Sequence, residues 1–361
     1  MLQEMLISVI ICFMKKIICI FLCLILTVLT CSCSAQRSST EKFSSSFLDL
    51  FDTASTVIAY DSSKESFDEN LKKFHDMLEE YDHLYSIYDS YDGITNLYQV
   101  NKQAAKEPIK VDSRIIDLLE YGKEVYNLSG GKTNICFGAV LSIWHKYRTV
   151  ATDNPDEAQL PPMDELKEAA KHTNIDDLVI DTENNTVFFK DPEMKLDVGA
   201  IAKGYAVEQV GEWSKGLWGS AALSIGGNIF TYGYKSNDGK TLWNIGIENP
   251  DKSVDDYVCS VRITELSVVV SGDYQRYYTV GGKKYCHIIN PDTLMPAEYF
   301  SGVSVICDNS ALGDALSTTL FNMPLDEGKR LVEGMDGVEA LWIDKSYNKT
   351  FSSGFESYID K

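Results

Sequence analysis

The spacing of hydrophobic residues divides the chain into alternating extended and helical segments. Residues 51–61 are rich in β-branched side chains and predict a strand. In residues 66–85 hydrophobic side chains recur every three or four positions, which predicts a helix with Ser66 and Glu69 as a capping box. The side chains of this stripe are Phe67, Leu71, Phe74, Leu78, Tyr81 and Tyr85. A second helix is predicted at about 112–128, where it ends at a Ser-Gly-Gly turn.

The remaining pattern mixes short helices with strands that hairpin turns connect. Helices are predicted at 163–172, 309–321 and 325–333, and residues 194–213 predict a strand, a glycine turn and a helix. Further strands are predicted at 178–189, 221–234, 243–248, 259–272, 276–280, 283–289, 338–344 and 350–359. This interleaving predicts an α+β fold of mixed, largely antiparallel sheets with packed helices, not a doubly wound parallel sheet. No repeat or linker divides residues 48–361, which we expect to form a single large domain.

The first 32 residues have the composition of an export signal. Two lysines precede a 14-residue apolar run at residues 17–30, which is too short for a membrane-spanning helix. Cys31 and Cys33 follow this run, and a cysteine there is typical of a bacterial lipoprotein, although an ordinary signal peptide has a similar layout. Translation from Met14 would give the signal a usual length. These features predict a lipid anchor at the extracytoplasmic face of a bacterial membrane.

Composition limits the partners of the rest of the chain. The net charge is −20 and the isoelectric point is about 4.6, so the chain has no broad basic surface for nucleic acid. Residues 33–47 are polar and serine-rich, which predicts a flexible tether after the signal. The remaining cysteines are far apart and lack a Cys-x-x-Cys pair, which favours buried small side chains over a zinc site or disulfides. They are Cys136, Cys259, Cys286 and Cys307.

The predicted helix at 309–321 carries an unusual pair of oxygen-bearing side chains. Asp314 and Thr318 are four residues apart, so both leave the same helical face. One interpretation is capping, with Asp314 as the N-cap residue and Thr318 bonded back to a carbonyl one turn earlier. The other is a hard-cation site, because an oxygen pair on a helix suits Mg²⁺. This stretch alone does not decide between them.

Two glycine-containing segments are candidate ligand sites. Asp197 to Gly199 lead from a strand into a helix start, a geometry that presents backbone N–H groups to an anion, and Lys203 lies one turn further on. The ordinary alternative is a solvated lysine. Gly226 and Gly227 interrupt an apolar strand, where they allow either close approach of a ligand or a tight turn.

Two further polar segments follow apolar strands. Ser271, Gly272 and Asp273 follow the apolar residues of the strand predicted at 259–272. They indicate either a ligand site at the end of that strand or an ordinary turn. His287 lies between apolar neighbours and ahead of a proline-rich loop, so it suits a general acid or base, although a structural histidine is the commoner outcome.

The order of these segments resembles the FAD:protein FMN transferase (ApbE-type) family, which includes flavin-trafficking lipoproteins of bacteria. The shared motifs are Asp-x-Gly-Ala-Ile-Ala-Lys-Gly-Tyr-Ala, Gly-Gly-Asn, Ser-Gly-Asp-Tyr-x-Arg, His-Ile-Ile-x-Pro-x-Thr-x-x-Pro and Asp-Ala-Leu-Ser-Thr. The resemblance runs from about residue 50 to the C-terminus and implies a single T-fold-related domain. The chain departs from the family at Phe51-Asp52-Thr53 (usually Met-Gly-Thr), at 133–136 (usually Phe-Asp-Ile-Thr) and at Asn290 (usually Asp).

The resemblance also implies roles for individual residues. Asp314, Thr318 and the backbone carbonyl of Ala200 would bind Mg²⁺, and His287 would take or orient the proton of the acceptor. The implied FAD contacts are Tyr88, Thr133, Asn134, Asp197, Lys203, Gly226, Gly227, Ser271, Gly272, Asp273 and Thr293. If His287 accepts a proton, the rate should rise with pH through a group near 6–7.

The activity implied by the resemblance is transfer of FMN from FAD to a Thr or Ser of a partner protein, through a phosphoester and with release of AMP. The implied acceptors are subunits of Na⁺-translocating NADH:quinone reductase or related electron-transfer complexes. Two alternatives need the same FAD site: an FAD pyrophosphatase that produces FMN and AMP, and a lipid-anchored flavin-binding protein without chemistry.

Overall fold

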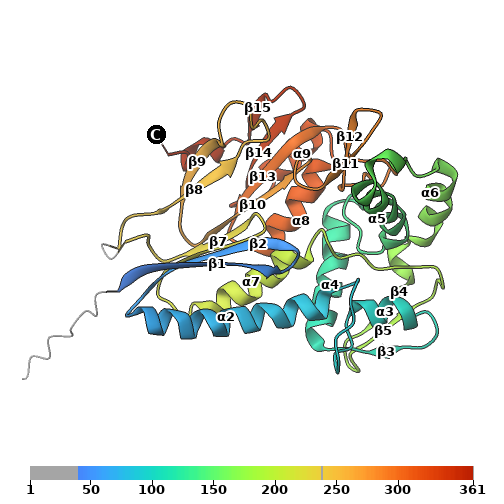
Figure 1. The fold of residues 1–361 in the computed structure, drawn as a ribbon, viewed down its shortest axis with the longest axis horizontal. Helices are drawn as coiled ribbons and strands as arrows, with labels where there is room; N and C mark the ends of the chain where they lie inside the picture. The colour runs from blue at the N-terminus through green and yellow to red at the C-terminus, as the bar shows by residue number, and fades with distance from the viewer. Residues whose placement is uncertain (1–39, 237–238, 361) are drawn as a thin grey trace, which may run out of the picture. The chain divides into compact units, whose positions relative to one another are not determined.

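The computed structural model describes residues 40–236 and 239–360, so the predicted signal and lipid-anchor cysteines lie outside the described residues. The fold is α+β, as predicted, and its largest sheet has eight strands in the order β1-β2-β6-β7-β10-β13-β14-β15, with antiparallel pairing throughout (Figure 1). These strands are β1 (Glu41–Leu50), β2 (Thr53–Asp61), β6 (Ala221–Ile225), β7 (Asn228–Tyr232), β10 (Leu266–Gly272), β13 (Phe300–Cys307), β14 (Glu339–Asp344) and β15 (Lys349–Phe351).

Three smaller sheets and a set of helices complete the described fold. The strands are β3 (Ile109–Lys110), β4 (Leu178–Asp181), β5 (Thr186–Phe189), β8 (Trp243–Glu248), β9 (Tyr257–Ile263), β11 (Tyr277–Val280) and β12 (Lys283–Cys286). The helices are α2 (Lys64–Tyr85), α3 (Leu97–Gln103), α4 (Ser113–Leu128), α5 (Gly138–Asp153), α6 (Met163–Ala169), α7 (Ala202–Ser214), α8 (Ser310–Phe321) and α9 (Leu325–Glu333), with short 3₁₀ turns at Pro155–Glu157, Ala170–His172, Ile175–Asp177 and Phe355–Tyr358.

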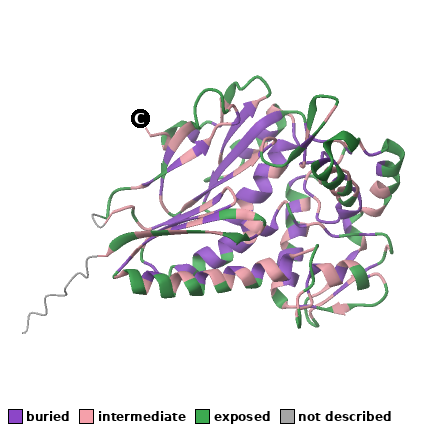
Figure 2. Cartoon of the chain, in the orientation of Figure 1, coloured by how far each residue is buried: buried purple, intermediate pink, exposed green. Residues whose placement is uncertain are grey.

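The large sheet is buried on both faces. Helices α2, α7 and α8 cover one face, and the β8–β9 hairpin covers part of the other (Figure 1). Strand β13 is buried at every position (Figure 2), because alternate side chains enter opposite cores. Val305 and Cys307 pack in the core with α8, whereas Ile306 packs with β8 and β9. This two-sided burial fixes the position of α8, which carries part of the site.

The predicted tether at 33–47 is wrong for residues 41–47. Strand β1 begins at Glu41 and pairs with β2 from Glu41–Asp61 to Leu50–Thr53, so the compact unit starts at Thr40 instead of residue 48. Phe43 and Phe47 are four residues apart and pack on the core from one face of this edge strand, while the serines between them tolerate solvent.

The start of α2 also differs from its prediction. The helix begins at Lys64, and Ser63 is the N-cap residue whose hydroxyl accepts from the Ser66 N–H. Ser66 and Glu69 therefore lie inside the helix and do not form a capping box. Among the described helices, none is both long and apolar enough to cross a membrane. The four cysteines of the described region are unpaired, and three of them are buried, as expected.

Candidate functional site

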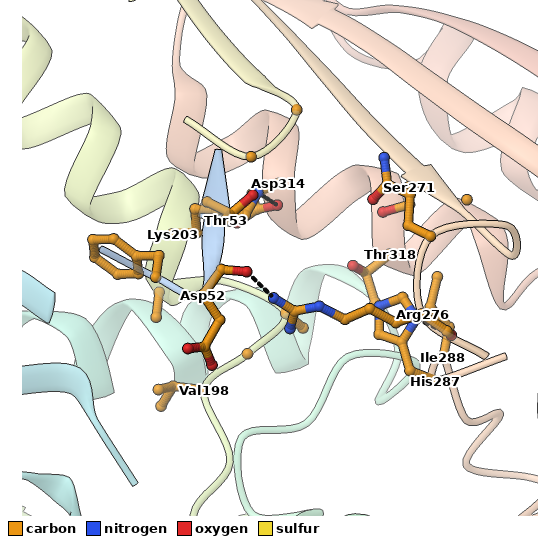
Figure 3. Close-up of a pocket in the computed structure, with 18 of the residues that line it drawn as sticks. Asp52, Thr53, Val198, Lys203, Ser271, Arg276, His287, Ile288, Asp314 and Thr318 are labelled. Carbon is orange, nitrogen blue, oxygen red and sulfur yellow. Dashed lines mark hydrogen bonds and ion pairs between the residues drawn. The ribbon is translucent and has the colours of Figure 1, made fainter. Parts of the chain in front are cut away.

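A cavity of about 1150 Å³ lies where the β1–β2 turn, helix α5, the start of α7, the end of β10 and helix α8 meet. Part of its lining is shown in Figure 3. Thirteen of the fifteen residues predicted for the site line this cavity: Tyr88, Thr133, Asn134, Asp197, Ala200, Lys203, Gly226, Gly227, Ser271, Gly272, His287, Asp314 and Thr318. Residues up to 230 positions apart in the chain are thus gathered around one space.

The structure does not bring Asp273 and Thr293 to the cavity lining. The Asp273 carboxylate pairs with the Lys345 ammonium at 2.7 Å. Thr293 is exposed in a turn that Asn290 organises, since Asn290 Oδ1 accepts from the N–H groups of Asp292 and Thr293. Both predicted FAD contacts therefore have local structural partners instead of a place in the cavity.

Two residues of the predicted set line the cavity, but their side chains form hydrogen bonds to other residues of the protein. Thr133 is buried, and its hydroxyl bonds to the hydroxyl of Thr319 at 2.8 Å. The side chain of Asn134 accepts from the Cys136 N–H at 2.8 Å and donates to the Thr173 carbonyl at 2.9 Å. These contacts support the cavity wall, and they show how this chain uses the segment in which it departs from the family pattern.

Helix α8 decides between the two interpretations of Asp314. Its N-cap residue is Asn309, whose side chain accepts from the Leu312 N–H at 2.8 Å, so the capping interpretation of Asp314 is wrong. Asp314 lies in the second turn and is only 6% exposed. Thr318 follows one turn later, and both side chains line the cavity (Figure 3).

Helices α7 and α8 are joined by two reciprocal hydrogen bonds. Asp314 Oδ2 accepts from the Gly204 N–H in the first turn of α7 at 2.7 Å. Glu208 Oε2 accepts from the Ser310 N–H in the first turn of α8 at 2.6 Å. Each carboxylate thus satisfies an amide that a helix start leaves without an intrahelical partner. Gly204 permits this close approach, because a Cβ there would meet Asp314 Cβ and would lie 2.6 Å from the Ser310 carbonyl oxygen.

The donor set of Ala200, Asp314 and Thr318 fits a hard cation. All three residues line the same cavity, and their carbonyl, carboxylate and hydroxyl oxygens are the ligand types that Mg²⁺ prefers. Asp314 Oδ1 takes no part in the bond to Gly204, and its ion-pair partner Lys203 Nζ is as far as 3.9 Å away. Within the described region no group of three or more His, Cys, Asp or Glu side chains could hold a metal, but the predicted set contains only one such residue.

Lys203 lies at the same end of the cavity. Its ammonium donates to Asn228 Oδ1 and lies 3.9 Å from Asp314 Oδ1. Burial lowers the pKa of Lys203, and the nearby Asp314 carboxylate opposes that effect. The Lys203 amino group therefore lies beside the predicted metal ligands, where the Asp314 carboxylate favours its charged form.

The two glycines form the β6–β7 turn. Gly226 and Gly227 have φ values of 53° and 87°, a conformation that side chains rarely adopt. A Cβ on Gly226 would lie 2.5 Å from Thr53 Oγ1, so close approach of β2 also excludes a side chain there. The tight-turn interpretation is confirmed, and the turn forms part of the cavity wall.

His287 is held from one side by a backbone carbonyl. Both its backbone N–H and its ring Nδ1 lie within hydrogen-bond distance of the Arg276 carbonyl, at 3.0 and 3.1 Å. Since a carbonyl only accepts, Nδ1 carries the hydrogen and Nε2 keeps a lone pair. Arg276 and His287 flank the β11–β12 hairpin, whose Tyr277–Cys286 pair sets their spacing.

The electrostatics of the cavity correct the predicted titration of His287. Burial, followed by the positive charges of Arg148 and Arg276, lowers the pKa of His287 to about 4. The expectation of a group near 6–7 is therefore wrong, because the ring lies in a recess with two guanidinium groups nearby. The imidazole is neutral at physiological pH and can accept a proton.

The sequence analysis missed the face of α5 that lines the cavity. Its lining residues are Phe137, Leu141, Trp144, His145 and Arg148. Arg148 Nη2 lies 3.0 Å from His145 Nδ1, and the His145 ring stacks on Tyr88 with centroids 4.9 Å apart. The sequence pattern that could have identified this face is the helical spacing of positions 141, 144, 145 and 148.

The β1–β2 turn is where the chain most clearly departs from the family pattern. Phe51 and Asp52 have φ values of 53° and 50°, in the left-handed region that favours glycine. The family pattern has glycine at the second of these positions, where this chain has Asp52. Two outside groups hold this turn: Asp82 Oδ1 accepts from the Phe51 N–H at 3.1 Å, and Arg276 Nη2 donates to the Asp52 carbonyl at 3.2 Å (Figure 3). Arg276 thereby links the turn to the His287 side of the cavity.

Several known proteins are similar to this chain in sequence and in fold. The model of the ApbE family matches residues 51–342. The chain is 32% identical over 260 residues to a FAD:protein FMN transferase of Treponema pallidum, covering 68% of this chain and 70% of that protein. It is 26% identical over 261 residues to one of Klebsiella pneumoniae, covering 72% and 78%. Among solved structures, an ApbE protein of Thermotoga maritima superimposes with a TM-score of 0.78 at 25% identity, covering 89% of this chain and all of that one. A flavin transferase ApbE of Vibrio cholerae gives 0.72 at 23% identity, covering 88% and 99%, which supports the fold.

Proposed function

This chain belongs to the ApbE family and is a transferase, and we propose that it transfers FMN from FAD to a hydroxyl side chain of an acceptor protein in a Mg²⁺-dependent reaction that releases AMP. One observation carries the proposal. In a single cavity the ammonium of Lys203 lies beside a set of hard oxygen donors that includes Asp314. A different wall of the same cavity carries His287, which is neutral at physiological pH. These are the groups that cleavage of a pyrophosphate by a protein hydroxyl requires.

Asp314, Thr318 and the carbonyl of Ala200 are the residues that would hold Mg²⁺. When bound, the metal would neutralise charge on the pyrophosphate oxygens as the bridging P–O bond breaks. Lys203 adds a fixed positive charge at the same end of the cavity. The two hydrogen bonds between α7 and α8 hold together the helix segments that carry the lysine and the aspartate.

His287 handles the proton of the acceptor. In the proposed step, the hydroxyl oxygen of the acceptor attacks the phosphorus of the FMN half of FAD, and the bond from that phosphorus to the bridging oxygen breaks. The hydroxyl proton passes to His287 Nε2, while AMP leaves with the bridging oxygen and its electron pair. The products are an FMN phosphoester on the acceptor and AMP. The Arg276 carbonyl fixes the ring tautomer that this step needs.

We further propose that the acceptor is a Thr or Ser in a subunit of Na⁺-translocating NADH:quinone reductase or a related electron-transfer complex. The family resemblance supports this assignment. The charged and apolar pattern of the first 32 residues supports anchoring of the protein through a lipid on Cys33 or Cys31, at the extracytoplasmic face of the membrane.

The test uses purified protein, FAD, Mg²⁺ and an acceptor domain that carries one candidate threonine. The expected result is an acceptor whose intact mass increases by one FMN less one water, together with an equal amount of AMP. An acceptor with alanine at that position and a reaction with EDTA are the controls, and neither should gain mass. Release of FMN and AMP with an unmodified acceptor would replace the proposal by hydrolysis, and tight FAD binding without AMP release would replace it by flavin storage.

A further inference from the structure

Asn228 is a buried polar residue directly behind the cavity wall. It is the first residue of β7, it follows the Gly226–Gly227 turn, and its exposed fraction is 0%. Its Oδ1 accepts from the Lys203 ammonium, whereas its Nδ2 is buried and has no hydrogen-bond partner in the described part of the chain. Asn228 does not itself line the cavity.

The orientation of this amide follows from the chemistry of its neighbour. A lysine ammonium can only donate, so the amide oxygen must face Lys203 and the amide NH₂ must point away from it. A buried NH₂ group without a partner is destabilising, and an apolar side chain of similar size would avoid that penalty. The arrangement therefore has a stability cost that the contact between the amide oxygen and the lysine must offset.

The Asn228 amide is uncharged, whereas the other oxygen near Lys203 belongs to the carboxylate of Asp314. Asp314 Oδ1 lies 3.9 Å from the ammonium and belongs to a residue assigned to the metal. A carboxylate in direct contact would neutralise the lysine, whereas an amide oxygen holds it in place and leaves its positive charge for an anionic substrate.

We propose that Asn228 is a positioning residue that holds the Lys203 ammonium toward the pyrophosphate of the substrate. This inference rests on the proposed function, because it takes FAD as the ligand that Lys203 meets. Asn228 acts through Lys203 and does not contact the substrate. The Gly226–Gly227 turn places the start of β7 so that the amide reaches Lys203 in α7.

The experiment is a double-mutant cycle on FAD binding in the presence of Mg²⁺, measured by titration calorimetry. The variants are Asn228→Ala, Lys203→Met and the double variant. If Asn228 acts through Lys203, each single change should weaken FAD binding about 10- to 100-fold, and the double variant should bind no more weakly than Lys203→Met alone. A purely structural effect of Asn228 would instead add to the effect of Lys203→Met.

Two further variants keep the test decisive if Asn228→Ala is poorly folded. Asn228→Asp has the same shape but puts a carboxylate against Lys203, so it should weaken FAD binding about tenfold or more while the melting temperature stays close to that of wild type. Ser267→Ala is the matched control, since Ser267 is also 0% exposed, has an unpaired hydroxyl and lies outside the cavity lining, and it should bind FAD like wild type.

The outcomes separate this inference from the proposed function. If wild type binds FAD and the double variant shows additive losses, or if Asn228→Asp binds like wild type, Asn228 does not act through Lys203 and the inference is overturned. If wild type itself does not bind FAD with Mg²⁺, the proposed function is wrong and the inference falls with it.

Discussion

Replacing Gly204 by alanine should separate α7 from α8 and damage the metal end of the cavity. A Cβ at this position would meet Asp314 Cβ and would lie 2.6 Å from the Ser310 carbonyl oxygen, which is closer than real Cβ atoms come. Relief of such overpacking typically costs about 1–3 kcal/mol. The movement would also stretch the 2.7 Å bond from the Gly204 N–H to Asp314 Oδ2, and a hydrogen bond to a charged group contributes about 1.5–3 kcal/mol.

Alanine favours a helix over glycine by about 1 kcal/mol, which offsets part of this loss. We therefore expect Gly204→Ala to lower the free energy of unfolding by about 2–5 kcal/mol in urea denaturation. Gly219→Ala is the matched control, because a Cβ there meets no atom within 4 Å and the residue needs no positive φ. The variant should also need a higher Mg²⁺ concentration for half-maximal activity, since Asp314 would shift. Wild-type stability together with a wild-type Mg²⁺ requirement in Gly204→Ala would refute the reasoning.

The remaining predictions concern the chemistry of the site and the anchor. His287→Ala should still bind FAD, but transfer should fall about 10²- to 10⁴-fold, and loss of FAD binding would instead make the residue part of the binding pocket. Because the pKa of His287 is lowered to about 4 and only the neutral ring accepts a proton, the transfer rate should be flat from pH 6 to 8 and fall as the pH drops toward 4. Arg148→Met should raise that pKa, so its acidic limb should lie at higher pH than in wild type; identical profiles would contradict the assigned cause. Asp314→Ala should abolish Mg²⁺-dependent turnover in a protein that is still folded, and activity that persists with Mg²⁺ would exclude the metal role. Mass spectrometry of the mature N-terminus should find a diacylglycerol thioether on Cys33 or Cys31, and an unmodified N-terminal cysteine would exclude the anchor.

Local patterns in the sequence were sufficient where one element contains the whole signal. The i, i+4 spacing predicted that Asp314 and Thr318 share a face of α8, and both line the cavity. The same spacing could not identify the N-cap residue, because Asn309 and Asp314 are both good capping residues and only the helix start distinguishes them. Strand β1 was missed because its serines suggested a tether, while the burial of Phe43 depends on a sheet formed by distant strands.

Other parts of the site depend on distances that the order of residues does not contain. Helix α5 brings Arg148 near His287, and the resulting change in the pKa of His287 requires both the recess and the nearby charge. Lys203 and Asn228 are 25 positions apart and belong to different elements, so nothing local predicts their contact. Family motifs identified many of the residues that line the cavity, but not the contacts through which they influence one another.

The base and the tip of the β11–β12 hairpin have different structural roles. Its base sets the spacing of Arg276 and His287, while its tip, Gly281–Gly282, is exposed and a Cβ on either glycine would meet no atom within 4 Å. Extra residues inserted at the tip would lengthen the hairpin outward and leave the register at its base unchanged. Insertions at this tip can therefore be made without changing the spacing of Arg276 and His287, and a fluorescent reporter grafted there would lie four strand residues from His287 along β12 and from Arg276 along β11.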